Sequence, residues 1–220
     1  MNGQRDIRVS VSILGADFTE LGQALERIRL SGADSIHLDV MDGRFVPNIS
    51  FGCSIASDIV RASGLPCCAH LMIEHPEDAF DAFVRAGVTE LLFHVEATRF
   101  PFRALQVLKE SGIRKGVAVN PVTQVASIVP LLDSLDTVLL MSVEPGFGGQ
   151  SFLQGTLDKV RALRSAADRS GKGLRIAVDG GVDVTNAAAL RDAGADELVA
   201  GTAFFEATDP SAFVKGLKGA

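Results

Sequence analysis

Four side chains that can bind a metal or transfer a proton stand at the ends of apolar, β-branched stretches: His37, Asp39, His70 and Asp179. Turn residues follow both aspartates. Such a stretch is typical of a buried strand, and a carboxylate there is costly to bury unless it binds a metal or takes part in chemistry. The four residues therefore predict one pocket with a metal site and two acid/base groups.

Two imidazoles and two carboxylates form a donor set that Zn, Fe(II), Mn and Co all accept. We expect one divalent metal cation, and the donor set does not distinguish among these four metals. A single histidine would more simply be a core residue bonded to backbone, but two of them beside two aspartates favour a metal site. His94 also lies near a strand end without an aspartate beside it. We therefore expect His94 to matter less than His70.

The two aspartates suit proton transfer at a carbon beside a carbonyl group. Such a proton is too weakly acidic to be removed in neutral water, but a metal on the carbonyl oxygen stabilises the enediolate that forms. A carboxylate on each face of this planar intermediate can remove a proton from one side and deliver one to the other, which inverts the carbon. Asp39 and Asp179 are the expected catalytic pair, and the sequence does not say which acts as base in each direction.

Three glycine-containing segments predict a phosphate site. They are Gly146-Phe147-Gly148-Gly149, Gly180-Gly181 and Gly201-Thr202, and each follows a predicted strand. Glycine lets the backbone approach an anion and turn its N–H groups inward. Simple tight turns are the alternative, but three clusters at neighbouring strand ends favour phosphate. The segments contain no lysine or arginine, so binding would depend on backbone dipoles.

The elements that position these residues follow one repeated pattern: an amphipathic helix, a glycine and an apolar strand. The glycines, such as Gly32, Gly87 and Gly194, suit left-handed helix C-caps. Strands apolar on both faces with helices between them indicate a parallel sheet covered by helices. Eight such units predict a single-domain α/β fold over residues 1–220, a (β/α)8 TIM barrel. The expected strands lie near residues 9–14, 35–40, 67–72, 90–94, 115–119, 136–142, 174–179 and 197–200.

The carboxyl ends of the strands form the active face of such a barrel, and the polar residues fall there. Asp39 and Asp179, on the second and seventh strands, would face each other across the mouth. Met41, Met72 and Met141 fall at the same rim. They would either line the site and exclude water or fill the core. Asp17 and Glu20, just before the first helix, are predicted to form a capping box.

Composition narrows the partners. The chain has 220 residues and a net charge of -6, with no basic stripe, so nucleic acid and anionic membranes are poor expectations as partners. It has no apolar run long enough to span a membrane and no signal-peptide pattern, which favours a cytoplasmic location. Cys53, Cys67 and Cys68 are expected to be buried free thiols. Whether the chain forms a homo-oligomer cannot be read from the sequence.

The chain resembles ribulose-phosphate 3-epimerases of the pentose phosphate pathway. The resemblance is carried by segments that keep the order of that family, namely Ser12–Phe18, His37–Asn48, His70–Met72, Asn120–Thr123, Met141–Gln150 and Val178–Gly181.

This resemblance implies a (β/α)8 fold, one divalent metal, and the interconversion of D-ribulose 5-phosphate and D-xylulose 5-phosphate. It implies that Asp39 and Asp179 are both metal ligands and the acid/base pair, and that Ser12 and His70 contact the sugar. The remaining implied ligands are His37 and His70 for the metal, and Gly146, Phe147, Gly148, Gly149, Gly180, Gly181, Gly201 and Thr202 for the phosphate.

Other functions stay open on the sequence. A D-allulose-6-phosphate 3-epimerase would use the same machinery, and only activity on the six-carbon substrate would separate it from a pentulose-phosphate enzyme. A decarboxylase or aldolase would lead us to expect a lysine near the strand-end aspartates, and the motifs contain none. A non-catalytic sugar-phosphate sensor would not need two acid/base carboxylates.

Overall fold

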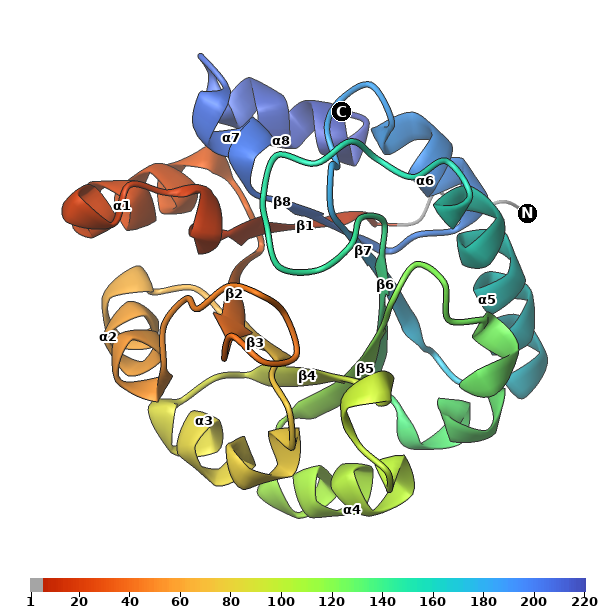
Figure 1. Ribbon diagram of the computed structural model, residues 1–220. Coiled ribbons are helices and arrows are strands. Elements are labelled where there is room, and N and C mark those ends of the chain that lie inside the picture. The colour runs from red at the N-terminus through yellow and green to blue at the C-terminus, as the bar shows by residue number, and fades with distance from the viewer. Residues whose placement is uncertain (1–5) are drawn as a thin grey trace.

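The computed structural model describes residues 6–220, within which eight parallel strands close into a barrel. Each strand pairs with its sequence neighbours and β8 pairs with β1, so the predicted (β/α)8 fold is confirmed (Figure 1). The strands are β1 (Arg8–Ser12), β2 (Ser35–Met41), β3 (Cys67–Met72), β4 (Glu90–His94), β5 (Arg114–Val119), β6 (Thr137–Met141), β7 (Arg175–Asp179) and β8 (Glu197–Ala200).

Helices surround the barrel as an outer ring (Figure 1). Short 3₁₀ turns, Val125–Ser127 and Val129–Ser134, stand where a helix was expected between β5 and β6. The helices are α1 (Leu21–Ser31), α2 (Cys53–Ser63), α3 (Phe80–Ala86), α4 (Pro101–Ser111), α5 (Thr156–Ser170), α6 (Ala187–Ala193), α7 (Thr202–Glu206) and α8 (Pro210–Lys218).

Glycine ends most of these helices, as the sequence predicted. Gly32, Gly87 and Gly194 all have positive φ and cap α1, α3 and α6, where a β-carbon would be strained. The prediction of a capping box before α1, formed by Asp17 and Glu20, is wrong. Asp17 accepts from the Thr19 N–H and so caps a separate 3₁₀ turn, while α1 starts at Leu21 without a side-chain cap.

Alternate residues of each strand face two different cores. In β2, Ile36 and Leu38 belong to the large apolar layer between the strands and the helices, whereas Asp39 turns toward the barrel interior. The interior is filled by a smaller cluster. Because the side-chain period of a strand is two, a register shift by one residue would bury the wrong set. The interior cluster is Cys68, Leu92, Ala118, Leu139, Met141, Val143, Ala177 and Val199.

An ion-pair network closes the amino-terminal end of the barrel. Arg175 Nη1 lies 3.2 Å from Glu90 Oε2 and 3.1 Å from Glu197 Oε2, and both carboxylates are buried. Arg8 and Arg114 approach the same two carboxylates at 3.6 Å. The network lies at the opposite end of the strands from the predicted site. This amino-terminal end is the one associated with stability in barrels of this kind.

Replacing Arg175 with methionine is expected to lower the free energy of unfolding by about 3 kcal/mol, because removing one partner leaves buried charge uncompensated. We expect this lower end of the usual range because Arg8 and Arg114 stay near the two carboxylates. Denaturant unfolding measures the change. Arg61→Met is the control, because the exposed Arg61–Asp58 pair contributes less than about 1 kcal/mol. Equal losses in both variants would contradict the prediction.

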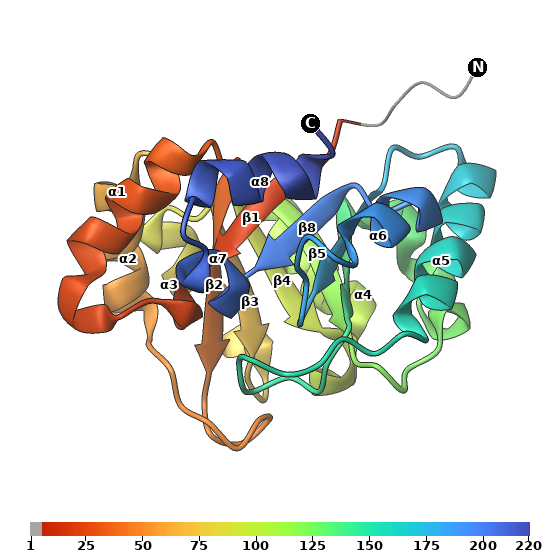
Figure 2. The ribbon, with the colours of Figure 1, turned by 90° about the horizontal axis from the view of Figure 1, so that it is seen from above.

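Two long loops extend past the carboxyl ends of the strands (Figure 2). The loop after β2 and the loop after β6 meet there, because Asn48 Nδ2 donates to the Gly146 carbonyl at 3.1 Å. The loop after β6 crosses in front of the strands in the view along the barrel (Figure 1).

No helix within residues 6–220 is long and apolar enough to cross a membrane. Of the three free cysteines, Cys67 and Cys68 are buried as predicted, but Cys53 at the start of α2 is exposed.

Candidate metal and acid/base site

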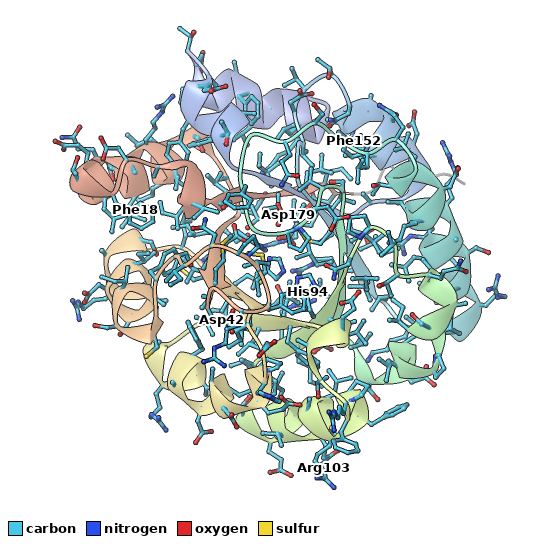
Figure 3. All side chains as sticks on the ribbon, in the orientation of Figure 1. Phe18, Asp42, His94, Arg103, Phe152 and Asp179 are labelled. Atoms are coloured by element: carbon cyan, nitrogen blue, oxygen red, sulfur yellow. The ribbon has the colours of Figure 1, made fainter. Side chains whose placement is uncertain are left out.

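The four predicted metal ligands come together inside the carboxyl end of the barrel. His37 and Asp39 come from β2, His70 from β3 and Asp179 from β7. In the parallel pairing of β2 with β3, Asp39 stands opposite His70. Both inward-facing residues therefore reach the same height in the barrel. Figure 3 shows Asp179 directed into the centre of the ring, far from Arg103 at its outer margin.

One donor atom from each of the four residues lies within 4.8 Å of every other. His70 Nδ1 is 2.9 Å from Asp39 Oδ1 and 3.2 Å from His37 Nε2. Asp179 Oδ2 is 3.7 Å from both of these imidazole nitrogens. With metal–ligand bonds of about 2.0–2.2 Å, the ligands of a tetrahedral site are separated by about 3.3–3.6 Å. The donor set and its spacing therefore fit one divalent cation.

The electrostatics of the site separate the two carboxyl groups. Burial, and then the charge of Asp39, raise the pKa of Asp179 to about 7. Burial also opposes ionisation of Asp39, but the charge of His37 and hydrogen bonds from both histidines hold the pKa of Asp39 well below its usual value. A pair of acids driven apart in this way can act as base and acid at the same pH.

The two imidazoles are separated in the same way. Burial lowers the pKa of His70 to about 4, and the neighbouring His94 and His37 act in the same direction. Burial also disfavours the charged form of His37, but the carboxylates of Asp39 and then Asp179 outweigh it and raise the pKa of His37 to about 9. Without a metal, the His37 cation thus balances the Asp39 carboxylate, and a metal bound at the cluster would displace the His37 proton.

Ser12 lies beside this cluster, as predicted for a sugar contact. Its hydroxyl donates to Asp39 Oδ2 at 2.5 Å, on the oxygen that does not face the histidines. The pairing of β1 with β2 puts Ser12 opposite His37 and so fixes this approach. In this structure Ser12 orients Asp39, and its contact with a sugar stays a prediction.

A cavity of about 560 Å³ opens above the cluster. Asp39 and Asp179 line it, but His37 and His70 do not, because both lie buried behind the carboxylates. The sugar contact predicted for His70 therefore has no support in the shape of the cavity. The other predicted residues that line it are Ser12, Met41, Met72, Met141, Gly146, Phe147, Gly148, Gly149, Gly180, Gly181, Gly201 and Thr202.

The glycine segments surround one side of this cavity. A β-carbon on Gly148 would lie 3.1 Å from Thr202 Oγ1, so the loops after β6 and β8 are neighbours. Gly15, Asp183 and Glu206 also line the cavity, and none of the three was a predicted site residue. No lysine or arginine among residues 6–220 lines it, and binding of an anion there by backbone groups stays a prediction.

Two of the glycines differ in what a side chain would meet. Gly181 has φ of +60°, and a β-carbon there would lie 2.7 Å from the Gln150 carbonyl oxygen. A substitution at Gly181 would therefore disturb the loop after β6 rather than only the anion site. A β-carbon at Gly201 would meet Ser12 at an ordinary 3.4 Å. Gly201 is consequently the better position for testing phosphate binding.

His94 contacts the predicted metal ligand His70, a neighbour relation that the sequence did not reveal. Its Nε2 atom lies 2.9 Å from His70 Nε2, and its ring is buried near the centre of the barrel (Figure 3). In the register of β3 with β4, His70 pairs with Leu92, and His94 is two residues further along the same face. Only this diagonal neighbour relation across two strands could have revealed the contact.

Comparison with known proteins decides the family. The model of the ribulose-phosphate 3 epimerase family matches residues 8–205. The chain belongs to the ribulose-phosphate 3-epimerase family. It is 44% identical over 214 residues to the ribulose-phosphate 3-epimerase of Bacillus subtilis, which covers 97% of this chain and 99% of that protein. It is 42% identical over 203 residues to the Escherichia coli K12 enzyme, which covers 91% of this chain and 90% of that protein.

Two solved structures with the same fold are more distant from this epimerase-family chain than these relatives. The 3-hexulose-6-phosphate synthase of Salmonella typhimurium superposes with a TM-score of 0.72 at 16% identity, covering 97% of both chains. A mutant tryptophan synthase α-subunit from Pyrococcus furiosus gives a TM-score of 0.69 at 17% identity, covering 99% of this chain and all of that one. At these identities the likeness shows the barrel fold alone.

Proposed function

We propose that this protein is a ribulose-phosphate 3-epimerase that interconverts D-ribulose 5-phosphate and D-xylulose 5-phosphate. The observation that carries the proposal is the pair Asp39 and Asp179, two carboxylates from β2 and β7 that line one cavity beside a metal donor set. The names of relatives at 42–44% identity support the same reaction. The extent of the domain over residues 1–220 and a cytoplasmic location stay predictions.

His37, Asp39, His70 and Asp179 would hold one divalent cation, whether zinc, iron, manganese or cobalt. When bound, such a cation stabilises negative charge that develops on the substrate oxygen beside the reacting carbon. The protein's own part is to hold these donors in fixed positions. The register of β2 against β3 fixes Asp39 and His70 at the same height, and the Ser12 hydroxyl holds the second oxygen of Asp39 through a hydrogen bond.

The two carboxyl groups would carry the proton transfer at C3. In one direction Asp39 removes the C3 proton and Asp179 delivers one to the other face. In the reverse direction the roles exchange, as microscopic reversibility demands. Met41, Met72 and Met141 line the cavity near these carboxyl groups and keep water from the planar intermediate.

The phosphate would be bound by backbone N–H groups of the loops after β6, β7 and β8. Gly146, Gly149, Gly180 and Gly181 have positive φ, a conformation that L side chains rarely adopt. These loops lie on one side of the cavity with the carboxylates at its base. A sugar phosphate bound there would place C3 between Asp39 and Asp179.

The deciding experiment follows C3 of the substrate directly. Purified protein is incubated with D-ribulose 5-phosphate in deuterated water, with and without a strong chelator, and both xylulose 5-phosphate and deuterium at C3 are measured. We expect product with deuterium at C3 and loss of both signals in chelator. Neither product nor exchange in the metal-loaded protein would refute the proposal. Faster turnover of D-allulose 6-phosphate would instead assign the six-carbon substrate.

Metal affinity is expected to fall as the pH falls. Protons compete with the metal at Asp179, whose pKa is raised to about 7, and at His37, whose pKa is raised to about 9. Both groups are therefore protonated below neutral pH, and we expect at least about a tenfold weaker Kd for each pH unit below 7. Chelator competition between pH 6 and 8 measures it. A Kd that does not change over this range would contradict the assignment of these ligands.

A further inference from the structure

A buried polar chain continues behind the four-residue cluster, on the side away from the cavity. His70 presents Nδ1 to Asp39 and His37, and its other nitrogen, Nε2, lies 2.9 Å from His94 Nε2. The planes of the His70 and His94 rings make an angle of 26° and their centroids lie 5.0 Å apart, which suits an in-line N–H···N bond. Neither ring is exposed.

The geometry allows only one arrangement of protons along this chain once a metal is present. A metal at the cluster needs the lone pair of His70 Nδ1, so the ring proton of His70 must lie on Nε2. This N–H can donate only to an unprotonated His94 Nε2. The ring proton of His94 must then lie on Nδ1, which faces Glu96 Oε2 at 3.4 Å.

Glu96 is held in place as the anionic end of the chain. It belongs to the 3₁₀ turn Val95–Ala97, directly after β4, and its Oε1 accepts from the Asn120 N–H at 2.9 Å. Burial disfavours its charge, but the neighbouring His94 and Thr123 side chains and the hydrogen bond from the Asn120 N–H keep the pKa of Glu96 below its usual value. Among residues 6–220, His94 Nδ1 makes no other hydrogen bond that would compete for its proton. The carboxylate oxygen that it faces is Glu96 Oε2.

The loop after β2 fixes the other face of His94. The Phe45 ring lies 4.6 Å from the His94 ring, measured between centroids. Asp42 Oδ1 accepts from the Phe45 N–H at 2.9 Å, and its other oxygen accepts from Glu74 N–H at 2.8 Å. Asp42, visible near the centre of Figure 3, thus ties this loop to the one after β3. The His94 ring consequently has no freedom to turn away from His70.

We propose that His94 and Glu96 are positioning residues, which hold His70 in the tautomer and orientation that metal binding requires. The inference rests on the metal site of the proposed function. Neither residue touches the cavity, so neither has a direct part in binding the sugar. Partners behind a metal-ligating histidine typically change metal affinity by about 10–100-fold when they are lost.

The test measures the zinc Kd by chelator competition for the full-length protein and its variants. His94→Phe keeps a ring of similar shape but has no acceptor, and we expect it to weaken zinc binding by about 10–100-fold. His94→Gln keeps a side-chain oxygen that can accept from His70, and we expect a Kd within about threefold of the unsubstituted protein. Glu96→Gln loses the anion and should fall between these two.

Glu90→Gln is the matched control. Glu90 is also buried and lies on β4, but it belongs to the network at the amino-terminal end of the barrel. We expect this variant to lower the Tm and leave the zinc Kd unchanged. A purely structural role for His94 would instead make the zinc Kd follow the Tm in all four variants, and that outcome would overturn the proposal.

A second measurement needs no substitution. In ¹⁵N-histidine protein loaded with zinc, long-range ¹H–¹⁵N correlation spectra report the protonated nitrogen of each ring. We expect His70 to carry its proton on Nε2 and His94 on Nδ1. A proton on Nε2 of His94 would refute the proposed series of hydrogen bonds from His70 through His94 to Glu96. Protein that retains no zinc would refute the metal site itself, whereas tight zinc binding that His94→Phe does not weaken would refute only the positioning role.

Discussion

Asp39→Asn and Asp179→Asn are each expected to lower the turnover of ribulose 5-phosphate by about 10²–10⁴-fold, the usual contribution of a general acid or base. Both carboxyl groups line the cavity, and their ionisation is separated by burial and by their neighbours. An amide keeps the size of the side chain but can neither take nor deliver the proton. Each aspartate is also a proposed metal ligand, so the loss can exceed this range.

Steady-state kinetics with metal content measured on the same samples separates these two causes. Variants that keep their metal and lose turnover have lost proton transfer, whereas variants that lose both have lost a ligand. Glu206→Gln is the control, because Glu206 contributes another carboxylate to the cavity wall. We expect it to turn over near the unsubstituted rate. If either aspartate variant kept more than about a tenth of that rate, its role as acid or base would be wrong.

Deuterium exchange at C3 distinguishes the two aspartates from each other. Two carboxyl groups on opposite faces each remove the proton from only one epimer. A variant that lacks one of them should therefore still exchange the C3 proton of the epimer that faces the remaining carboxylate, without forming the other epimer. Equal loss of exchange for both epimers in a variant that keeps its metal would contradict this two-sided arrangement.

The barrel could be predicted because its signals are local. Apolar runs and left-handed glycine caps depend on neighbouring residues alone, so β2, expected near 35–40, is found at Ser35–Met41. The first strand, expected to reach residue 14, ends at Ser12. The Ser12 hydroxyl accepts from the Leu14 N–H and turns Ile13–Gly15 into a 3₁₀ turn. That side-chain bond competes with the strand and has no signature in hydrophobic periodicity.

The site could be predicted only as far as strand ends reveal it. Asp39 and Asp179 were recognisable because a carboxylate interrupts an apolar run. His94 was not, since its contact with His70 depends on the stagger of β3 against β4. The difference between Gly181 and Gly201 likewise needs the path of the loop after β6, which approaches Gly181 and leaves Gly201 open.

Removal of the phosphate from the substrate is expected to lower kcat/KM by at least about 10³-fold. Three hydrogen bonds from backbone N–H groups to a charged phosphate, at about 1.5–3 kcal/mol each, would supply this much. None of the cavity residues within 6–220 is a lysine or arginine, so no side-chain cation can replace these bonds. Binding energy from the phosphate can also act at the reacting carbon, so kcat should fall together with affinity.

Gly201→Val tests the same site from the protein side. A β-carbon at Gly201 meets Ser12 at 3.4 Å and so makes no clash, but the added methyl groups narrow the backbone approach to the anion. We expect a higher KM for ribulose 5-phosphate with unchanged metal content. Gly22→Val is the control, because a β-carbon there, on α1, meets nothing within 4 Å. Free ribulose that turned over as efficiently as its 5-phosphate would refute both the phosphate loops and the sugar-phosphate substrate.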